Sequence, residues 1–238
     1  DTKDVKMASI YRDTYAYIPD VGYDKINSAY ARDGYSLAIS TINTNYDLDI
    51  RKYVTVNFKV LVDIIDFLDG ITLDIDDQEL KYLNGYVNEL NKINGTNVTH
   101  LESSGTQNVN GTQATAYARI RYTAGGDFKR TQRQRIVIEN VFRKTKKLKF
   151  TKINTMVDTF LPMVYTNFSS KDIMDLLKSF LSYDIEEETG FPFKKDSHRY
   201  NKVSYVFPID LQENVKKLHL FLYDEADYIP SPNVKEYS

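Results

Sequence analysis

The sequence of 238 residues contains no cysteine, which excludes disulfide bonds and thiolate chemistry. No apolar run approaches the ~20 residues that a membrane-spanning helix needs, and no secretory signal segment is visible. Charge of one sign is not in excess either, because 31 Lys and Arg stand against 33 Asp and Glu, a net charge of −2. This balance argues against a general nucleic-acid binder, which is usually basic over the whole domain.

Histidine is scarce, and its three positions are far apart in the chain: His100, His198 and His219. No spacing of His with Ser or Asp therefore predicts a metal site or a nucleophilic triad. The acidic cluster at 74–77 contains three Asp, but it lacks the Gly and the terminal Glu that an EF-hand loop requires. We therefore predict no metal site made by this chain alone.

What the sequence does contain is an alternation of strand-like and helix-like segments. This pattern predicts an α/β fold with a mixed central sheet covered by helices on both faces (α-β-α). The length suits a single domain over residues 1–222, and the Pro-bearing segment 223–238 is predicted to be a peripheral C-terminal tail. Because residues 5–11 already have the character of a strand, we expect residue 1 to lie inside a domain, which is therefore N-terminally incomplete.

The individual elements follow from hydrophobic periodicity and from helix-terminus signals. Amphipathic spacing is clearest at 169–181, where Ser169 and Asp172 have the spacing of a capping box. Two other segments, 15–23 and 84–113, are predicted to be irregular. The predicted strands are 5–11, 53–56, 71–76, 117–122 and 203–207, and the predicted helices are 35–45, 58–68, 128–149, 156–165, 169–181 and 211–222.

The most informative stretch is 119–134, which reads RIRYTAGGDFKRTQRQ. In the predicted strand 117–122, Arg119 and Arg121 point to the same face because side chains alternate along a strand. A Gly-Gly turn follows, and Asp127 is predicted to cap the next helix. The two guanidinium groups would therefore lie near the start of a helix.

The helix after the turn carries Arg130, Arg133 and Gln134 on one face, because they are spaced at i, i+3 and i+4. Several convergent Arg side chains suit a phosphate or pyrophosphate, since the planar guanidinium group matches phosphate oxygens in a bidentate manner. A nearby helix N-terminus adds favourable backbone N–H dipoles. The stretch therefore predicts a phosphate-binding site.

The alternative for this stretch is a basic strip on the surface, paired with acidic neighbours elsewhere. Against that alternative, residues 119–135 hold five Arg and one Lys but a single acid, Asp127, in a chain that is nearly neutral. The positive charge is therefore concentrated locally. Both interpretations stay open on these residues alone.

A second candidate region lies where the first predicted strand ends. Arg12 precedes an irregular loop there, and loops at such positions often carry ligand-binding residues. A local surface pair between Arg12 and Asp13 is the alternative. Lys25, further along, could face a ligand, although a lone Lys is more often exposed to solvent.

Taken in order, these pieces resemble the LytR-CpsA-Psr family. Their order and spacing match over roughly residues 5–145, and short similar pieces at 166–169 and 191–192 extend the resemblance. Any one motif alone would be weak, whereas the set is specific. The motifs are RDT at 12–14, DKIN at 24–27, NGTQA at 110–114, YARIRY at 117–122 and GDFKRTQRQ at 126–134.

The resemblance implies the extracytoplasmic catalytic domain of a Gram-positive-type bacterial protein, anchored in the membrane by an upstream transmembrane helix. Members of the family are phosphotransferases of cell-wall biogenesis. They attach glycopolymers such as teichoic acid or capsular polysaccharide to peptidoglycan, from a donor linked to polyprenyl pyrophosphate. The prenyl tail is expected in an apolar tunnel within the fold, bordered by the helix faces of 58–68 and 173–181.

At the level of residues, the resemblance implies one pyrophosphate site assembled from several motifs. Four further positions are candidates for substrate binding: Asp13, Lys25, Asp127 and Arg133. The side chains implied to hold the pyrophosphate are Arg12, Arg119, Arg121, Arg130 and Gln134.

The resemblance also implies Mg²⁺, but the family's usual carboxylate ligands would lie upstream of this chain. The base that activates the acceptor hydroxyl is not identifiable; Asp13 is the nearest candidate, and orienting Arg12 is its alternative role. The alternative function is a non-catalytic binding module for a prenyl-linked or anionic cell-wall polymer. We expect no nucleic-acid partner, since no helix-turn-helix with a basic recognition face is visible.

Overall fold

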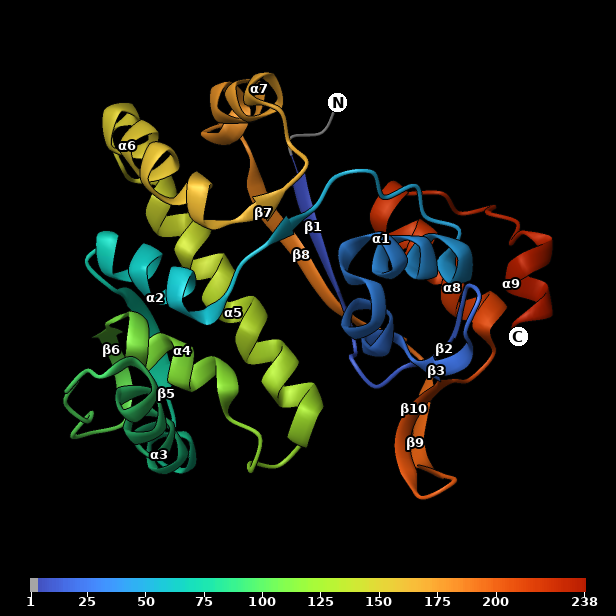
Figure 1. The fold of residues 1–238 in the computed structure, drawn as a ribbon, viewed down its shortest axis with the longest axis horizontal. Coiled ribbons are helices and arrows are strands. Elements are labelled where there is room, and N and C mark those ends of the chain that lie inside the picture. Colours follow the sequence, from blue (N-terminus) through green and yellow to red (C-terminus); the bar gives the residue numbers. More distant parts are fainter. Residues whose placement is uncertain (1–3) are drawn as a thin grey trace. The chain divides into compact units, whose positions relative to one another are not determined.

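A computed structural model describes residues 4–238, apart from the side chain of Ser170. Residues 1–3 of the predicted domain lie outside the described residues. Helices and strands interleave along the chain, as the sequence predicts (Figure 1). None of the helices in the described part is long and apolar enough to cross a membrane.

The chain divides into two compact units, and the single domain over 1–222 stays a prediction. One unit comprises Asp1–Tyr53 and Asp184–Ser238, and the other comprises Val54–Tyr183. Within residues 4–238 the strands pair only two by two, in five sheets, and do not join into one larger central sheet.

The strands of the first unit form three pairs. The loop predicted for 15–23 is a hairpin instead, because Ala16 and Ile18 are buried while their neighbours along the strand are less so. Burial of every second residue is the signature of a strand. The pairs are β1 (Asp4–Ile10) parallel to β8 (Asp184–Phe191), β2 (Tyr15–Ile18) antiparallel to β3 (Gly22–Lys25), and β9 (Lys195–Tyr200) antiparallel to β10 (Val203–Pro208).

The C-terminal segment is part of the core of the first unit, which differs from the peripheral tail that the sequence predicts. Val234 is fully buried, and the carboxylate of Asp47 accepts hydrogen bonds from Tyr228 and Ser231. A buried apolar anchor and a satisfied carboxylate together hold the segment in place. The helices of this unit are α1 (Ile26–Tyr46), α8 (Leu211–Tyr223) and α9 (Pro232–Glu236).

The second unit is mainly helical. The prediction that 84–113 is irregular is wrong for its first part, which belongs to the helix Asp77–Asn94, and for its last part, which contains the strand Gly105–Val109. The helix is polar along its surface, but Asp76 and Glu79 form a capping box at its start. The helices of the second unit are α2 (Phe58–Phe67), α3 (Asp77–Asn94), α4 (Gly111–Arg119), α5 (Gly126–Lys146), α6 (Phe150–Phe160), η1 (Leu161–Met163) and α7 (Ser170–Phe180). The strand pairs of this unit are β4 (Val54–Thr55) with β7 (Tyr165–Thr166) and β5 (Ile71–Ile75) with β6 (Gly105–Val109).

The motif at 110–114 fixes the position of α4. Asn110 and Gln113 form a capping box, in which the backbone N–H of each donates to the side chain of the other at 3.0 Å. A Cβ atom at Gly111 would lie 2.2 Å from the carbonyl oxygen of Val62, so only glycine permits this approach to α2. The motif therefore determines where α4 starts and how closely it packs against α2.

The strand predicted for 117–122 is wrong. Residues up to Arg119 belong to α4, and Ile120 closes the helix. Residues 111–118 are buried on every side, so no helical periodicity shows in their sequence. The alanines in this run favour a helix, and the capping box at its start confirms that choice. Arg119 and Arg121 consequently do not share the face of a strand.

Candidate functional site

Arg119 ends α4 against two aromatic rings of the second unit. Its guanidinium carbon lies 5.3 Å from the ring centre of Tyr86 and 5.7 Å from that of Phe58. One of its terminal nitrogens is 3.4 Å from a carboxylate oxygen of Glu89, a long ion pair. About a quarter of the side chain is exposed. The charge is therefore oriented by aromatic faces while remaining accessible to a ligand.

Asp127 links two of the predicted arginines. It is not the helix N-cap that the sequence predicts, because Gly125 takes that position and Asp127 lies in the first turn of α5. Its carboxylate accepts hydrogen bonds from Arg121 at 2.9 Å and 3.2 Å, and Nη1 of Arg130 lies 3.3 Å away. The bond to Asp127 raises the pKa of Arg121. Arg121 and Arg130 are thus held together at the start of α5, both fully charged.

Arg133 points into the protein and is only 3% exposed. Its Nε donates to Glu79 at 2.7 Å, and its terminal nitrogens donate to the carbonyl of Ile120 at 3.2 Å and to the hydroxyl of Thr123 at 2.7 Å. These partners lie on α3 and on the connection between α4 and α5. Arg133 therefore fixes the segment that carries Arg121.

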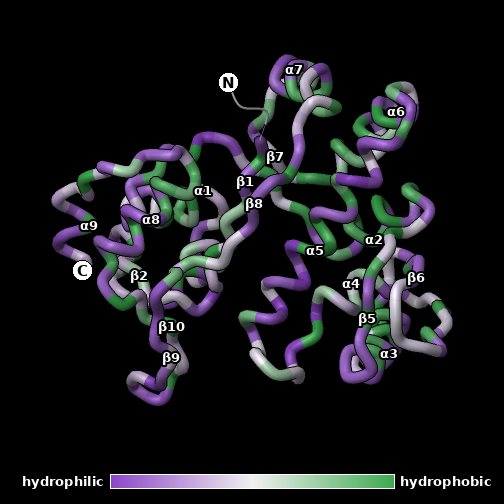
Figure 2. The backbone as a smooth tube through the Cα atoms, turned by 180° about the vertical axis from the view of Figure 1, so that it is seen from behind, coloured by the Kyte–Doolittle hydropathy of each residue, from purple (hydrophilic) through white to green (hydrophobic). Residues whose placement is uncertain are grey.

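Tyr86 lies near both Arg119 and Arg121. Burial raises the pKa of Tyr86, and the charges of the two arginines act in the opposite direction. Arg121 is more exposed than Arg119, with 44% of its side chain accessible. Figure 2 shows the first half of α5, which follows these residues, as largely hydrophilic. The region is therefore a positively charged surface next to a tyrosine.

An apolar cavity of about 470 Å³ opens beside these charges. The amide side chain of Gln134 lines it, and so does Phe58, the ring over which Arg119 lies. The face of 58–68 thus borders a cavity, as predicted, whereas the face of 173–181 contributes no lining residue among those described. The other lining residues are Val54, Val56, Asn57, Leu61, Ile64, Ala118, Val137, Ile138 and Val141.

The candidates of the first unit are close neighbours of one another. Asp13 lies between two cations, with its Oδ1 3.1 Å from Nζ of Lys25 and 3.5 Å from Nε of Arg12. The backbone is held firmly here, since Val206 donates to the carbonyl of Asp13 at 2.9 Å. About half of the Arg12 side chain is exposed. Asp13 is therefore placed to orient Arg12 and Lys25.

The described residues do not fit the implied Mg²⁺. No group of three or more Asp, Glu, His or Cys side chains within residues 4–238 could hold a metal ion. Asp13 is paired with two cations, and Asp76 caps α3 by accepting from the backbone of Glu79. Asp77 accepts a hydrogen bond from Ser104. We therefore derive no step through a metal ion.

Comparison with known proteins identifies the family. The model of the LytR_cpsA_psr family matches residues 1–219. This chain belongs to that family. The predicted family is thereby confirmed. The structure also shows what two of its motifs do: the motif at 110–114 positions α4, and the motif at 126–134 forms the start of α5.

Named members of the LytR_cpsA_psr family include teichoic acid transferases. The chain is 30% identical over 220 residues to polyisoprenyl-teichoic acid–peptidoglycan teichoic acid transferase TagT of Bacillus subtilis, covering 91% of this chain and 65% of TagT. It is 28% identical to TagU of Enterococcus faecalis, covering 90% of this chain and 68% of TagU. Biofilm regulatory protein A of Streptococcus mutans is 31% identical, with 79% of this chain and 48% of that protein covered. The chain thus spans about half to two thirds of the length of these relatives.

Solved structures of family members share the fold. TagT with bound octaprenyl pyrophosphate lipid has a TM-score of 0.69 and 28% identity, with 92% of this chain and 79% of TagT covered. TagT bound to LIIa-WTA has a TM-score of 0.74 and 29% identity, with 92% of this chain and 80% of TagT covered. The predicted α/β fold of the LytR-CpsA-Psr type is confirmed.

Sequence reasoning missed the residues that surround the arginines. Glu79 is 54 positions away from Arg133, its ion-pair partner, and Phe58 and Tyr86 reach Arg119 from α2 and α3. No spacing in the sequence signals such long-range pairs. Thr123 lies within the informative stretch 119–134, between its two motifs, and was not singled out.

Proposed function

We propose that this chain is the catalytic domain of a phosphotransferase that attaches a polyprenyl-pyrophosphate-linked glycopolymer, a teichoic acid or a wall or capsular polysaccharide, to peptidoglycan. Family membership and the names of TagT and TagU support this function, as does the octaprenyl pyrophosphate bound to TagT. The single observation that carries the proposal is the apolar cavity lined by Gln134 and Phe58, next to Arg119.

The head group of the donor is proposed to bind at the start of α5 and the end of α4. The side chains of Arg121 and Arg119 are partly accessible there, and Arg130 adds a further positive charge beside Asp127. Guanidinium groups bind phosphate oxygens through charge-assisted hydrogen bonds. Gln134, which lines the cavity, is proposed to contact the pyrophosphate where it joins the lipid.

Three of the four lower-ranked candidates take supporting roles in this proposal. Asp127 orients Arg121 and Arg130, and Arg133 positions the connection between α4 and α5 from inside the protein. In the first unit, Asp13 orients Arg12 and Lys25. The participation of Arg12 and Lys25 in the same site is a prediction from the resemblance.

The prenyl tail is proposed to occupy the apolar cavity. Its lining is aliphatic and aromatic apart from Asn57 and Gln134, and its volume of about 470 Å³ is within the usual ~300–1,000 Å³ of ligand pockets. Burial of isoprene units there would remove apolar surface from water, which stabilises the complex by roughly 25 cal/mol per Å².

In the reaction we propose, a hydroxyl oxygen of peptidoglycan attacks the phosphorus atom that bears the glycopolymer. A new phosphorus–oxygen bond forms, the bond to the bridging oxygen breaks, and prenyl phosphate leaves with the electron pair. The hydroxyl proton passes to a base. Asp13 is the nearest candidate in the sequence, but its carboxylate already faces Lys25 and Arg12, and we assign it the role of orienting these two cations. The arginines offset the negative charge that develops on the phosphate oxygens.

A lipid-linked donor and a peptidoglycan acceptor imply a location at the outer face of the cell membrane. We therefore propose an extracytoplasmic position in a Gram-positive-type bacterium, with an upstream transmembrane helix as the anchor that the resemblance implies. The relatives TagT and TagU come from Bacillus subtilis and Enterococcus faecalis, which supports this proposal.

The function is tested by incubating the protein with a labelled, polyprenyl-pyrophosphate-linked glycopolymer and peptidoglycan, and measuring the label that becomes covalently attached. We expect transfer by the wild type, a loss of about tenfold or more with Arg119→Ala, and no loss with Arg143→Ala. Arg143 is a matched control because it is exposed and pairs only locally with Glu139. Donor binding without transfer would instead support the binding module, and neither binding nor transfer would overturn both.

A further inference from the structure

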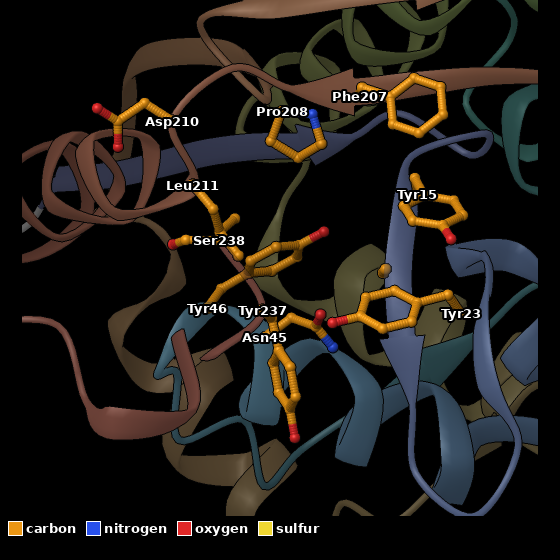
Figure 3. A pocket seen from close by; sticks show the side chains of 11 residues that line it. Tyr15, Tyr23, Asn45, Tyr46, Phe207, Pro208, Asp210, Leu211, Tyr237 and Ser238 are labelled. Carbon is orange, nitrogen blue, oxygen red and sulfur yellow. The ribbon is translucent and has the colours of Figure 1, made fainter. Parts of the chain in front are cut away.

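A second cavity lies within the first unit, formed without any residue of the arginine cluster. Its volume is about 310 Å³. Figure 3 shows aromatic side chains around it, contributed by the β2–β3 hairpin, by the end of α1, by β10 and by the C-terminal segment. The lining residues are Tyr15, Ala16, Tyr23, Asn45, Tyr46, Phe207, Pro208, Asp210, Leu211, Tyr237 and Ser238.

Tyr46 brings an unsatisfied hydroxyl group to this cavity. The residue is 1% exposed, and its hydroxyl has no hydrogen-bond partner among the described residues. Figure 3 shows it pointing toward the space framed by Pro208, Tyr15 and Tyr23. Buried polar groups nearly always have a partner, because leaving one unpaired is costly. A hydroxyl in this state is therefore available to a ligand.

The walls of the cavity are mainly aromatic. Tyr15 and Tyr23 are stacked, with ring centres 5.2 Å apart and an angle of 10° between the planes. Phe207 lies against Tyr15 at 4.9 Å. The hydroxyl of Tyr23 points toward the same space as that of Tyr46 (Figure 3). The cavity thus offers apolar ring surfaces together with two hydroxyl groups.

The charge of the lining excludes an anionic ligand. No Lys or Arg lines the cavity in the described part of the chain. The one acidic side chain of the lining, Asp210, accepts a hydrogen bond from the backbone of Glu213 at 3.1 Å as the cap of α8, and in Figure 3 it points away from the other labelled side chains. The amide of Asn45 is also occupied, by the backbone of Tyr17 and Thr41. A suitable ligand is neutral, with C–H groups for the rings and hydroxyls for Tyr46 and Tyr23.

We propose that this cavity binds one neutral sugar ring. A pyranose has apolar C–H faces that pack on aromatic rings, and hydroxyl groups at its edge that can both donate to and accept from a tyrosine. The volume is at the lower end of the ~300–1,000 Å³ range of ligand pockets, which fits a single ring better than a longer chain. This inference goes beyond the proposed transfer reaction and does not depend on the arginine cluster.

The test is a titration of the protein with methyl glucoside and N-acetylglucosamine, followed by NMR, for the wild type, Tyr46→Phe and Tyr30→Phe. Tyr46→Phe removes only the oxygen atom. Tyr30→Phe is the matched control, because Tyr30 is on the same helix, is 48% exposed and does not line the cavity. Glucose 6-phosphate is the ligand control, since its charge has no partner in the cavity.

We expect saturable binding of at least one neutral sugar, weakened about tenfold by Tyr46→Phe and unchanged by Tyr30→Phe. The melting temperature of Tyr46→Phe should be equal to or above that of the wild type, because an unpaired hydroxyl is removed. Absence of sugar binding, equal binding by Tyr46→Phe, or preference for the phosphorylated sugar would overturn the inference. Loss of prenyl-pyrophosphate binding with sugar binding intact would count against the proposed function alone.

Discussion

The carboxylate of Asp127 accepts a hydrogen bond from two nitrogen atoms of Arg121, at 2.9 Å from Nε and 3.2 Å from Nη2. This bidentate contact fixes the plane of the guanidinium group. Because 44% of the Arg121 side chain remains exposed, an incoming phosphate would meet a cation that is already oriented. Preorganised donors bind charge without the cost of ordering themselves at the moment of binding.

Replacing Arg121 by lysine tests this geometry. An ammonium group is a point charge and cannot reproduce the planar fork, so Arg121→Lys should weaken binding of a prenyl pyrophosphate by about tenfold. The fold should persist, since exposed ion pairs contribute only ~0–1 kcal/mol. The same change at Arg143, an exposed residue further along α5, is the control. Equal affinities of the two variants in isothermal titration calorimetry would contradict the role of the fork.

Arg133 should matter for stability rather than for direct ligand contact. Its ion pair with Glu79 is nearly inaccessible, with 4% and 11% of the two side chains exposed. Breaking a buried pair from one side leaves an uncompensated charge, so Arg133→Ala should lower the free energy of unfolding by about 3–5 kcal/mol. The double variant Arg133→Met/Glu79→Leu should recover only part of this loss, because Glu79→Leu also removes the bond that Glu79 accepts from the backbone of Asp76 in the capping box of α3. Chemical denaturation measures both, and a loss below about 1 kcal/mol in Arg133→Ala would be the contrary result.

The sequence predicted the fold best where a short local motif was enough to define the start of an element. The capping box of Ser169 and Asp172 marks the start of α7 as expected. The strand predicted around Arg119 was wrong. The prediction relied on the alternation of side chains along a strand, but residues 111–118 are buried on all sides, so their sequence shows no periodicity. The capping box of Asn110 and Gln113 was present in the sequence and would have corrected it.

The environment of the site could not be predicted in the same way. The cluster of arginines was visible as a local excess of charge, but the partner of Arg133 is 54 positions away. The rings that orient Arg119 belong to two other helices. Such contacts depend on how helices pack, and packing is set by the whole core rather than by the spacing of residues in one segment.

A substitution that narrows the apolar cavity should weaken binding of the lipid tail and leave binding of the phosphate groups unchanged. Ile138 lines the cavity and is 52% exposed, so Ile138→Trp can fill space without disrupting the core. We expect weaker binding of a long-chain prenyl pyrophosphate, with binding of inorganic pyrophosphate unchanged. Ile93→Trp is the control, because Ile93 is 71% exposed and does not line the cavity. If both tryptophan variants bind the lipid like the wild type, the tail lies elsewhere.

Stability at alkaline pH should report on the packing around Tyr117. Burial raises the pKa of Tyr117 to about 12, above the ~10 of an unfolded tyrosine. A pKa that is higher in the folded state gives a contribution to stability that is present below pH ~10 and is lost as the pH rises toward 12. Tyr117→Phe should therefore lose less stability than the wild type over this interval. Identical pH dependence of unfolding in the two proteins would argue against this burial.

The most direct test of the central claim is the affinity of wild type and Arg119→Ala for a prenyl pyrophosphate, measured by calorimetry. The guanidinium group of Arg119 lies over the ring of Phe58, which lines the apolar cavity. Loss of its charge-assisted bonds should weaken binding about ten- to a hundredfold, with the fold retained. Equal affinities for wild type and Arg119→Ala would contradict the account and reduce the cluster to a solvated basic surface.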